Sequence, residues 1–276
     1  MNIGVFDSGL GGLTILKSFL ENLPQYSYVY LGDNARVPYG NRSPEIIYEF
    51  TKQAIDFLAK KDCSLIIIAC NTSTATSLRK IQHEYLPKAY PNLKVLGVIK
   101  PTVEEIAKKK YKKIGVIGTK ATVSSGAFVR EIKKVLPDAQ IYQQACPLLV
   151  PYVEDSGRNK MILKLILKEY LDDLEKKQIE TLLLACTHYE IVQKEIEDEV
   201  GPKIKVISES RIVAGSLKNY LEKHHEIEST LGKSADLKQR VTYCVTDLNP
   251  DYHKLMKLFL GQHLADREIH HVKINQ

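Results

Sequence analysis

One motif occurs twice in this chain, as Leu65-Ile-Ile-Ile-Ala-Cys70-Asn-Thr72 and as Thr181-Leu-Leu-Leu-Ala-Cys186-Thr-His188, 116 positions apart (186 − 70). Each copy is a short apolar run that ends in Ala-Cys and is followed by small polar residues. Such runs are typical of buried parallel strands, and open α/β sheets place their chemistry at the carboxyl ends of these strands. The motif pair therefore predicts a thiol at each of two related strand ends.

A second similarity supports an internal repeat. Asn2-Ile-Gly-Val-Phe-Asp7 opens the chain, and Lys113-Ile-Gly-Val-Ile-Gly118 follows 111 positions later (114 − 3). Buried strands are all rich in aliphatic residues, so one such match can arise by chance. Two matches at similar offsets favour two related α/β halves, which would form a site with pseudo-twofold symmetry.

The composition is that of a soluble globular protein. The chain has 276 residues, of which 44% are hydrophobic and 26% charged, and no apolar run approaches the 18 residues of a membrane helix. The amino terminus enters a strand without a basic and apolar leader, so export is not expected. The odd number of cysteines, five, favours free thiols in a reducing cytoplasm, and the lack of a Cys-x-x-Cys pair argues against structural zinc.

The net charge of +6 comes mainly from lysines scattered over predicted helices. No basic motif is interleaved with aromatic residues, so a solvated surface is a better interpretation than nucleic-acid binding. A mild positive field favours small anionic substrates. We therefore expect neither a nucleic acid nor a membrane among the partners.

Strands and helices alternate along the chain, which predicts mostly parallel sheets covered by helices on both faces. We expect strands near 2–6, 27–31, 64–69, 94–98, 113–117, 139–144, 181–185 and 204–207. We expect helices near 12–22, 44–60, 73–85, 101–109, 123–135, 159–176, 188–199 and 211–222.

The predicted boundaries are a linker around 97–102, marked by Gly97 and Pro101, and a second boundary near 208–212. The polar stretch 224–238 is expected to be a loop. A tail follows with a strand at 240–245, a helix at 251–260 and an extended end at 268–274, which is too short to form its own core. The predicted domains are therefore 1–98 plus 211–276, and 99–210, with the binding site in the cleft between them.

Cys70 and Cys186 each precede a predicted helix start, where the helix dipole lowers the pKa of a thiol. A single cysteine after a buried strand is more often an inert small apolar residue, but the matched pair favours function. The residues that follow them, Asn71-Thr72 and Thr187-His188, offer groups that bind a carboxylate, and His188 can also relay a proton. Few reactions need a thiol on each of two opposed faces, and inverting a carbon centre by proton transfer is one of them.

Three further segments carry candidate groups. Asp7-Ser8-Gly-Leu-Gly-Gly12 permits close backbone approach to a ligand, or is a plain turn with Asp7 as a cap. The loop 31–40 is long, and its Pro38-Tyr39-Gly40 would present rigid backbone to a site, whereas Asp33 and Arg36 could simply form a local ion pair. Glu154 follows an apolar run and is either a buried functional acid or a solvated one at a helix end. The remaining cysteines are expected to be structural, and the remaining histidines to lie on the surface.

Together, four motifs resemble the glutamate racemases of the aspartate/glutamate racemase family, which serve bacterial cell-wall synthesis: Phe6–Gly12, Leu31–Gly40, Ala69–Thr72 and Ala185–Tyr189. The resemblance implies two α/β domains, a cofactor-independent reaction, and Cys70 and Cys186 as the catalytic thiols. It implies that Asp7 supports the first thiol, and that Glu154 and His188 support the second. It places the substrate against Ser8, Pro38, Tyr39, Gly40, Asn71, Thr72, Thr119, Thr122 and Thr187.

The chain departs from the family pattern at three places. Glu190 replaces the usual proline and adds a charge near the expected mouth of the site, while Lys100-Pro101-Thr102 and Glu209-Ser210 replace the usual turn and hinge residues. The first change leaves the choice between glutamate, aspartate, or both acids open.

The expected reaction interconverts L- and D-glutamate and supplies D-glutamate for peptidoglycan. Moving a Cα proton without a cofactor needs a base, an acid and donors that stabilise the carbanion, and no metal is expected. A Cys-His thiol hydrolase built on Cys186 and His188 is a weaker alternative, because it would not need Cys70. A non-catalytic amino-acid-binding protein would need neither thiol. The sequence leaves a homodimer open.

Overall fold

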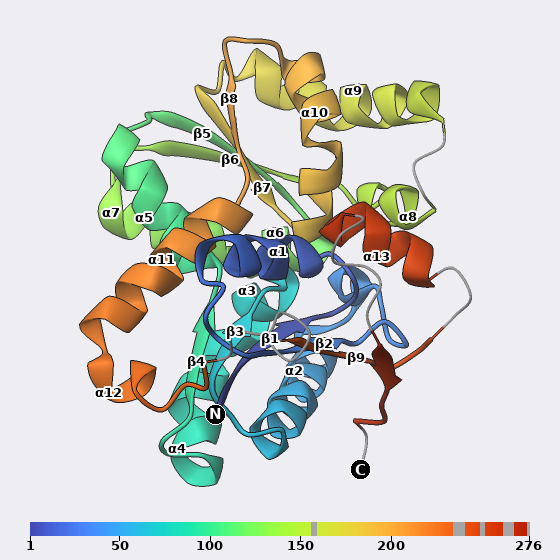
Figure 1. Ribbon diagram of the computed structural model, residues 1–276. Helices are drawn as coiled ribbons and strands as arrows, with labels where there is room; N and C mark the ends of the chain where they lie inside the picture. The colour runs from blue at the N-terminus through green and yellow to red at the C-terminus, as the bar shows by residue number, and fades with distance from the viewer. Residues whose placement is uncertain (156–158, 234–240, 249–251, 262–267, 275–276) are drawn as a thin grey trace.

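Two parallel sheets form the centre of the computed structural model, which describes residues 1–155, 159–233, 241–248, 252–261 and 268–274 (Figure 1). The larger sheet has the order β10-β9-β2-β1-β3-β4 and the smaller one the order β6-β5-β7-β8. The strands of the larger sheet are β1 Asn2–Asp7, β2 Tyr28–Gly32, β3 Cys63–Ile68, β4 Lys94–Gly97, β9 Val241–Val245 and β10 Ile269–His271. Those of the smaller sheet are β5 Lys113–Gly118, β6 Gln140–Ala145, β7 Thr181–Ala185 and β8 Lys205–Ile207.

The two sheets repeat one strand order, since β2-β1-β3-β4 corresponds to β6-β5-β7-β8. The two Ile-Gly-Val segments form β1 and β5, the central strands of these four-strand units, and the cysteine motifs form β3 and β7 beside them. All pairings between these strands are parallel. The predicted fold class, two similar α/β units with mostly parallel sheets, is confirmed. The division at 98/99 and 210/211 stays a prediction.

Helices cover both faces of each sheet (Figure 1). Two of them begin at clear side-chain caps: Ser43 accepts the amide of Ile46 ahead of Pro44, and Asn159 accepts the amides of Met161 and Ile162. The α-helices are α1 Leu13–Asn22, α2 Pro44–Lys60, α3 Asn71–Lys80, α4 Leu86–Ala89, α5 Ile99–Lys109, α6 Lys120–Ser125, α7 Ala127–Val135, α8 Leu149–Glu154, α9 Lys160–Lys176, α10 Gln193–Val200, α11 Ser210–Lys223, α12 His225–Glu228 and α13 Tyr252–Leu260. Two short 3-10 helices are η1 Tyr39–Asn41 and η3 Thr187–Val192, and η2 Ile81–Tyr85 is a π-helix between α3 and α4.

Several predicted boundaries are wrong. The linker expected at 97–102 is instead the start of α5, because Pro101 lies in the first turn, where a proline is compatible with a helix. The helix predicted at 123–135 is broken at Gly126, which has φ +63°. The helix predicted at 188–199 begins as the 3-10 turn η3, and α8 was not predicted at all.

The tail packs on the first half of the chain, as predicted. β9 pairs with β2, β10 pairs with β9, and α13 contacts α1. The stretch predicted as a loop contains the short helix α12, and Lys233 forms an isolated bridge with Tyr26. Residues 234–240, with the predicted loop end at 238 and strand start at 240, lie outside the described residues, as does the predicted helix start at 251. None of the described helices combines the length and apolar character that a membrane-spanning segment needs.

One hydrophobic cluster runs from the larger sheet into the smaller one. It joins Ile3 and Val5 of β1 with the residues of α1, and continues through Ile117 and Leu184 to Cys186. Because this packing crosses from one sheet to the other, it holds the two motif-bearing strand ends in a fixed relation.

Candidate active site

Cys70 lies directly after β3 and caps helix α3. Its Sγ accepts the amide of Ser73 at 3.5 Å, and its thiol donates to Oγ of Ser8 at 3.4 Å. Burial, and then the nearby charge of Asp7, raise the pKa of this thiol to about 11. The pKa is therefore raised, not lowered as expected from the helix start, because the thiol is only 5% exposed and desolvation outweighs the hydrogen bonds. Cys70 is held as a protonated thiol.

Cys186 follows β7 and has a different set of neighbours. Its Sγ lies 4.0 Å from Nδ1 of His188, and Nε2 of the same ring lies 3.1 Å from Oε1 of Glu154 at the end of α8. Phe259 of α13 packs edge-on against the imidazole, with ring centroids 5.6 Å apart. The arrangement is a relay from a thiol through an imidazole to a carboxylate.

Burial is the largest influence on His188, and it lowers the pKa. The contacts with Cys186 and Glu154 outweigh it and raise the pKa of the imidazole to about 10. His188 therefore favours the imidazolium form at neutral pH, which places a cation 4.0 Å from Sγ of Cys186. The two thiols thus have different polar neighbours, a hydroxyl beside Cys70 and an imidazole beside Cys186.

Asp7 connects the two motif regions. It is fully buried at the end of β1, where Oδ2 accepts the amide of Gly9 at 3.0 Å and Oδ1 accepts from Oγ1 of Thr187 at 3.5 Å. Burial raises the pKa of this carboxyl, and the charge of His188 opposes the rise. Asp7 is therefore both a turn residue and a contact to the second thiol segment.

The glycine-rich turn after β1 packs so closely on the second thiol segment that glycine is required at position 11. A Cβ on Gly11 would lie 2.2 Å from Oγ1 of Thr187 and 2.5 Å from Nδ1 of His188. Only glycine leaves room for these two side chains beside the turn that follows β1.

Three threonines meet across the two halves of the fold. Oγ1 of Thr72, on α3, lies 2.9 Å from Oγ1 of Thr119 and 3.4 Å from Oγ1 of Thr122, on α6. Thr119 also caps α6 by accepting the amide of Thr122 at 3.2 Å. A Cβ on Gly40 would lie 2.5 Å from Cβ of Thr119, so the loop after β2 closes on the same cluster. The sequence-predicted substrate residues Gly40, Thr72, Thr119 and Thr122 are thereby brought together.

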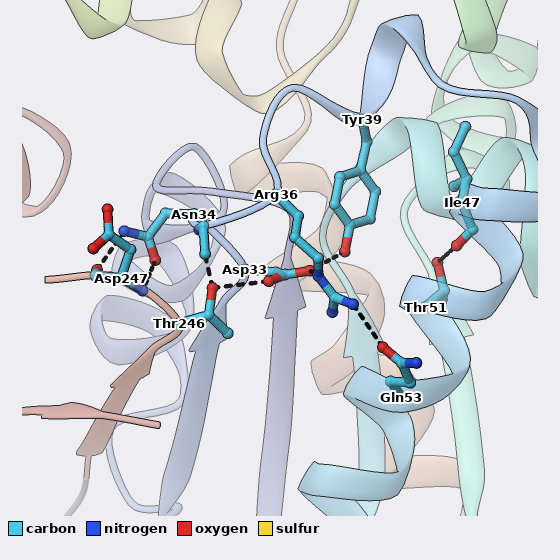
Figure 2. A network of polar contacts seen from close by, with 10 residues as sticks. Asp33, Asn34, Arg36, Tyr39, Ile47, Thr51, Gln53, Thr246 and Asp247 are labelled. Atoms are coloured by element: carbon cyan, nitrogen blue, oxygen red, sulfur yellow. Dashed lines mark hydrogen bonds and ion pairs between the residues drawn. The ribbon is translucent and has the colours of Figure 1, made fainter. Parts of the chain in front are cut away.

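The loop before Gly40 is anchored by Asp33 (Figure 2). Its buried carboxylate accepts from Oγ1 of Thr246 at 2.8 Å, from Nε of Arg36 at 2.6 Å and from the phenol of Tyr39. The predicted ion pair between Asp33 and Arg36 is therefore present. The phenol of Tyr39 points to Asp33, and its ring packs on Phe6 and Phe50, so only the backbone of Tyr39 can face a ligand. Pro38, which precedes Tyr39, is joined to Val37 by a cis peptide bond.

Some contacts at the site were not predicted from the sequence. Phe259 reaches His188 from the tail, and Glu209 binds the side chain of Asn71. Two features of the sequence could have indicated these residues: the apolar periodicity of the tail helix for Phe259, and the acidic residue at the predicted second boundary for Glu209. Glu190, expected near the mouth of the site, accepts from Oγ of Ser210 at 2.5 Å. Within the described ranges, no group of three or more His, Cys, Asp or Glu side chains is arranged to hold a metal ion.

Comparison with known proteins gives consistent matches. The model of the Asp/Glu/Hydantoin racemase family matches residues 6–216. The glutamate racemase of Aquifex aeolicus (strain VF5) is 40% identical over 268 residues, which cover 97% of each chain. The crystal structure of glutamate racemase from Francisella tularensis subsp. tularensis SCHU S4 in complex with D-glutamate superposes with a TM-score of 0.87 at 32% identity, covering 99% of this chain and 98% of that one.

A further solved structure, the glutamate racemase from Aquifex pyrophilus, has a TM-score of 0.76 at 38% identity and covers 95% of this chain and 96% of that one. The matches span nearly the whole length of each protein, and they agree with the two parallel sheets described above. The resemblance seen in the four motifs is confirmed. The chain belongs to the Asp/Glu/Hydantoin racemase family and is an isomerase, an amino-acid racemase.

Proposed function

We propose that this chain is a glutamate racemase that interconverts L- and D-glutamate with Cys70 and Cys186 as its two proton carriers and without a cofactor. The observation that carries the proposal is the pair of thiols at equivalent strand ends, one beside the hydroxyl of Ser8 and the other beside the imidazole of His188. The relatives named as glutamate racemases, which match over nearly the full length, support the choice of substrate.

In the proposed reaction, one thiolate removes the Cα proton and the opposite thiol donates a proton to the other face. The imidazolium of His188 favours Cys186 as the starting thiolate, and Glu154 holds that imidazole. The raised pKa of Cys70 favours the protonated thiol. The two residues exchange roles when the opposite enantiomer reacts.

The negative charge that develops on the substrate carboxylate needs hydrogen-bond donors. The starts of α3 and α6 can supply backbone amides, and the hydroxyls of Thr72, Thr119 and Thr122 form a cluster between those helices. Thr187 adds a hydroxyl from the second thiol segment. We assign these groups, with Ser8, Asn71 and the backbone of residues 38–40, to substrate binding.

A second candidate function has one observation in its favour. Cys186, His188 and Glu154 form a sequence of nucleophile, base and orienting acid, which also suits a thiol hydrolase. A hydrolase would not need Cys70, so Cys70→Ala separates the two functions. Within the racemase function, aspartate, alone or with glutamate, is the alternative substrate.

The proposed role is the supply of D-glutamate for peptidoglycan synthesis in the cytoplasm. All five cysteines are free and buried, which is consistent with a reducing compartment. Residues 1–98 plus 211–276, and 99–210, remain our proposed domains, with the substrate between them. Glutamate is the proposed partner, and a homodimer remains open.

A chiral assay tests the proposal directly. The purified chain, dialysed against chelator and given no cofactor, is incubated separately with each enantiomer of glutamate and of aspartate. We expect both glutamate enantiomers to reach the same equal mixture. Turnover of aspartate but not of glutamate would show that aspartate is the substrate. Activity that returns only with added metal would reject the cofactor-independent reaction.

A further inference from the structure

Glu209 lies where the chain crosses back from the smaller sheet to the larger one, between β8 and α11. Its side chain is only 3% exposed. Oε2 accepts from Nδ2 of Asn71 at 2.6 Å, and Oε1 lies 3.1 Å from Oγ1 of Thr102. Thr102 belongs to α5, the helix that makes the first crossing. One carboxyl group therefore joins both crossings to the residue that follows Cys70.

The hydrogen bonds around Thr102 indicate the protonation state of Glu209. Oγ1 of Thr102 also lies 3.0 Å from the carbonyl oxygen of Val98, which can only accept a hydrogen bond. The threonine hydroxyl has a single proton. Both contacts are satisfied when Thr102 donates to Val98 and a protonated Oε1 of Glu209 donates to Thr102. Burial raises the pKa of Glu209 to about 8, against the lowering effect of the hydrogen bond that Asn71 donates.

Asn71 is oriented by this contact. Because Nδ2 donates to Glu209, the side-chain amide cannot rotate to exchange its nitrogen and oxygen. Oδ1 is buried and has no hydrogen-bond partner among the residues that the structure describes. Asn71 itself is 2% exposed, so an acceptor is held, without a partner, on the residue next to a catalytic thiol.

An α-amino acid supplies one strong donor to such an acceptor. Its carboxylates only accept hydrogen bonds at neutral pH, whereas its ammonium group donates three. A buried acceptor left without a partner is costly, so binding an ammonium group there is favourable.

We propose that Glu209 is a positioning residue, which fixes the side-chain amide of Asn71 so that Oδ1 accepts a hydrogen bond from the α-ammonium group of the substrate. The proposal rests on the proposed function as a glutamate racemase. Glu209 does not touch the substrate and acts through Asn71. As a neutral carboxylic acid, Glu209 accepts from Asn71 with its carbonyl oxygen and donates to Thr102 with its hydroxyl. A glutamine at this position can present the same acceptor and donor through its side-chain amide.

The test uses Glu209→Gln, Glu209→Leu and a control, Glu222→Leu, which removes an exposed carboxylate from helix α11, the helix that follows Glu209. Each protein is assayed for racemisation of D-glutamate and for inhibition by glutarate, a dicarboxylate without an ammonium group. We expect Glu209→Leu to raise KM for D-glutamate on the order of 10-fold, with a smaller change in kcat, and to leave Ki for glutarate within about twofold. Glu209→Gln and Glu222→Leu should stay close to the wild type in both measurements.

Two results would overturn the positioning role. One is an equal weakening of D-glutamate and glutarate in Glu209→Leu, which indicates a general structural role. The other is a loss in Glu209→Gln on the order of 10-fold, which shows that a charge is needed; this variant decides alone if Glu209→Leu does not fold. Absence of glutamate racemisation in the wild type would instead reject the proposed function, so the two failures are distinguishable.

Discussion

The relay from Cys186 to Glu154 makes His188→Asn the most informative single substitution. The imidazole contacts both groups, and its pKa rises from 6.5 to about 10. At about 1.4 kcal/mol per pKa unit, this rise corresponds to on the order of 5 kcal/mol of favourable interaction with the two partners that remains after the opposing effect of burial. If roughly half of it belongs to the thiolate of Cys186, its loss slows proton transfer on the order of 10²-fold.

The assay is steady-state racemisation from each enantiomer, followed by circular dichroism, with kcat and KM determined separately. We expect kcat to fall on the order of 10²-fold while KM changes by less than about threefold, because the imidazole acts on proton transfer. The control is His83→Asn, which removes an exposed imidazole. A change confined to KM would refute the reasoning and reassign His188 to substrate binding.

Three further predictions concern other groups of the site. Cys70→Ala and Cys186→Ala should each abolish racemisation while circular dichroism shows an intact fold, and Cys63→Ala and Cys244→Ala serve as controls. Activity above a few per cent in either of the first two variants would contradict the need for two proton carriers. Asp7→Asn should lower kcat on the order of 10²-fold, since it removes the buried charge beside both motif segments, whereas an effect on KM alone would assign Asp7 to binding. Burial raises the pKa of Glu209 in the folded state from an ordinary 4.5 to about 8, so the folded state holds a proton that the unfolded state loses between these values. The unfolding free energy of the wild type should therefore fall from about pH 5 to pH 8 relative to Glu209→Gln. Urea unfolding at pH 5 and pH 8 measures the unfolding free energy of both proteins. If the difference in unfolding free energy between wild type and Glu209→Gln is the same at the two pH values, the pKa of Glu209 is not raised.

The alternation of strands and helices was predictable because strands that are buried on both faces are near-continuous aliphatic runs. The exceptions depend on details of backbone geometry. Gly126 has a left-handed conformation that ends α6, although the surrounding sequence continues a helical pattern. The apolar run before Glu154 contains two prolines, Pro147 and Pro151, which made the short helix α8 difficult to predict.

The positions of the thiols at equivalent strand ends were predictable from the repeated motif, but their partners were only partly so. Thr187 and His188 are close to Cys186 in sequence, whereas Asn71 meets Glu209 across 138 positions. The pKa of Cys70 was predicted in the wrong direction for a similar reason. A local motif shows the helix start, but the desolvation of the thiol depends on how distant segments close around it.

The central claim, that two separate thiols carry the proton, is tested most directly by racemisation of protiated glutamate in deuterated water. With two bases, the residue that donates to the product is not the one that removed the original hydrogen. The account therefore predicts that early product carries deuterium at Cα, while the recovered starting enantiomer stays largely protiated. Substantial transfer of the original hydrogen into the product would contradict it, because that result requires one residue to serve both faces.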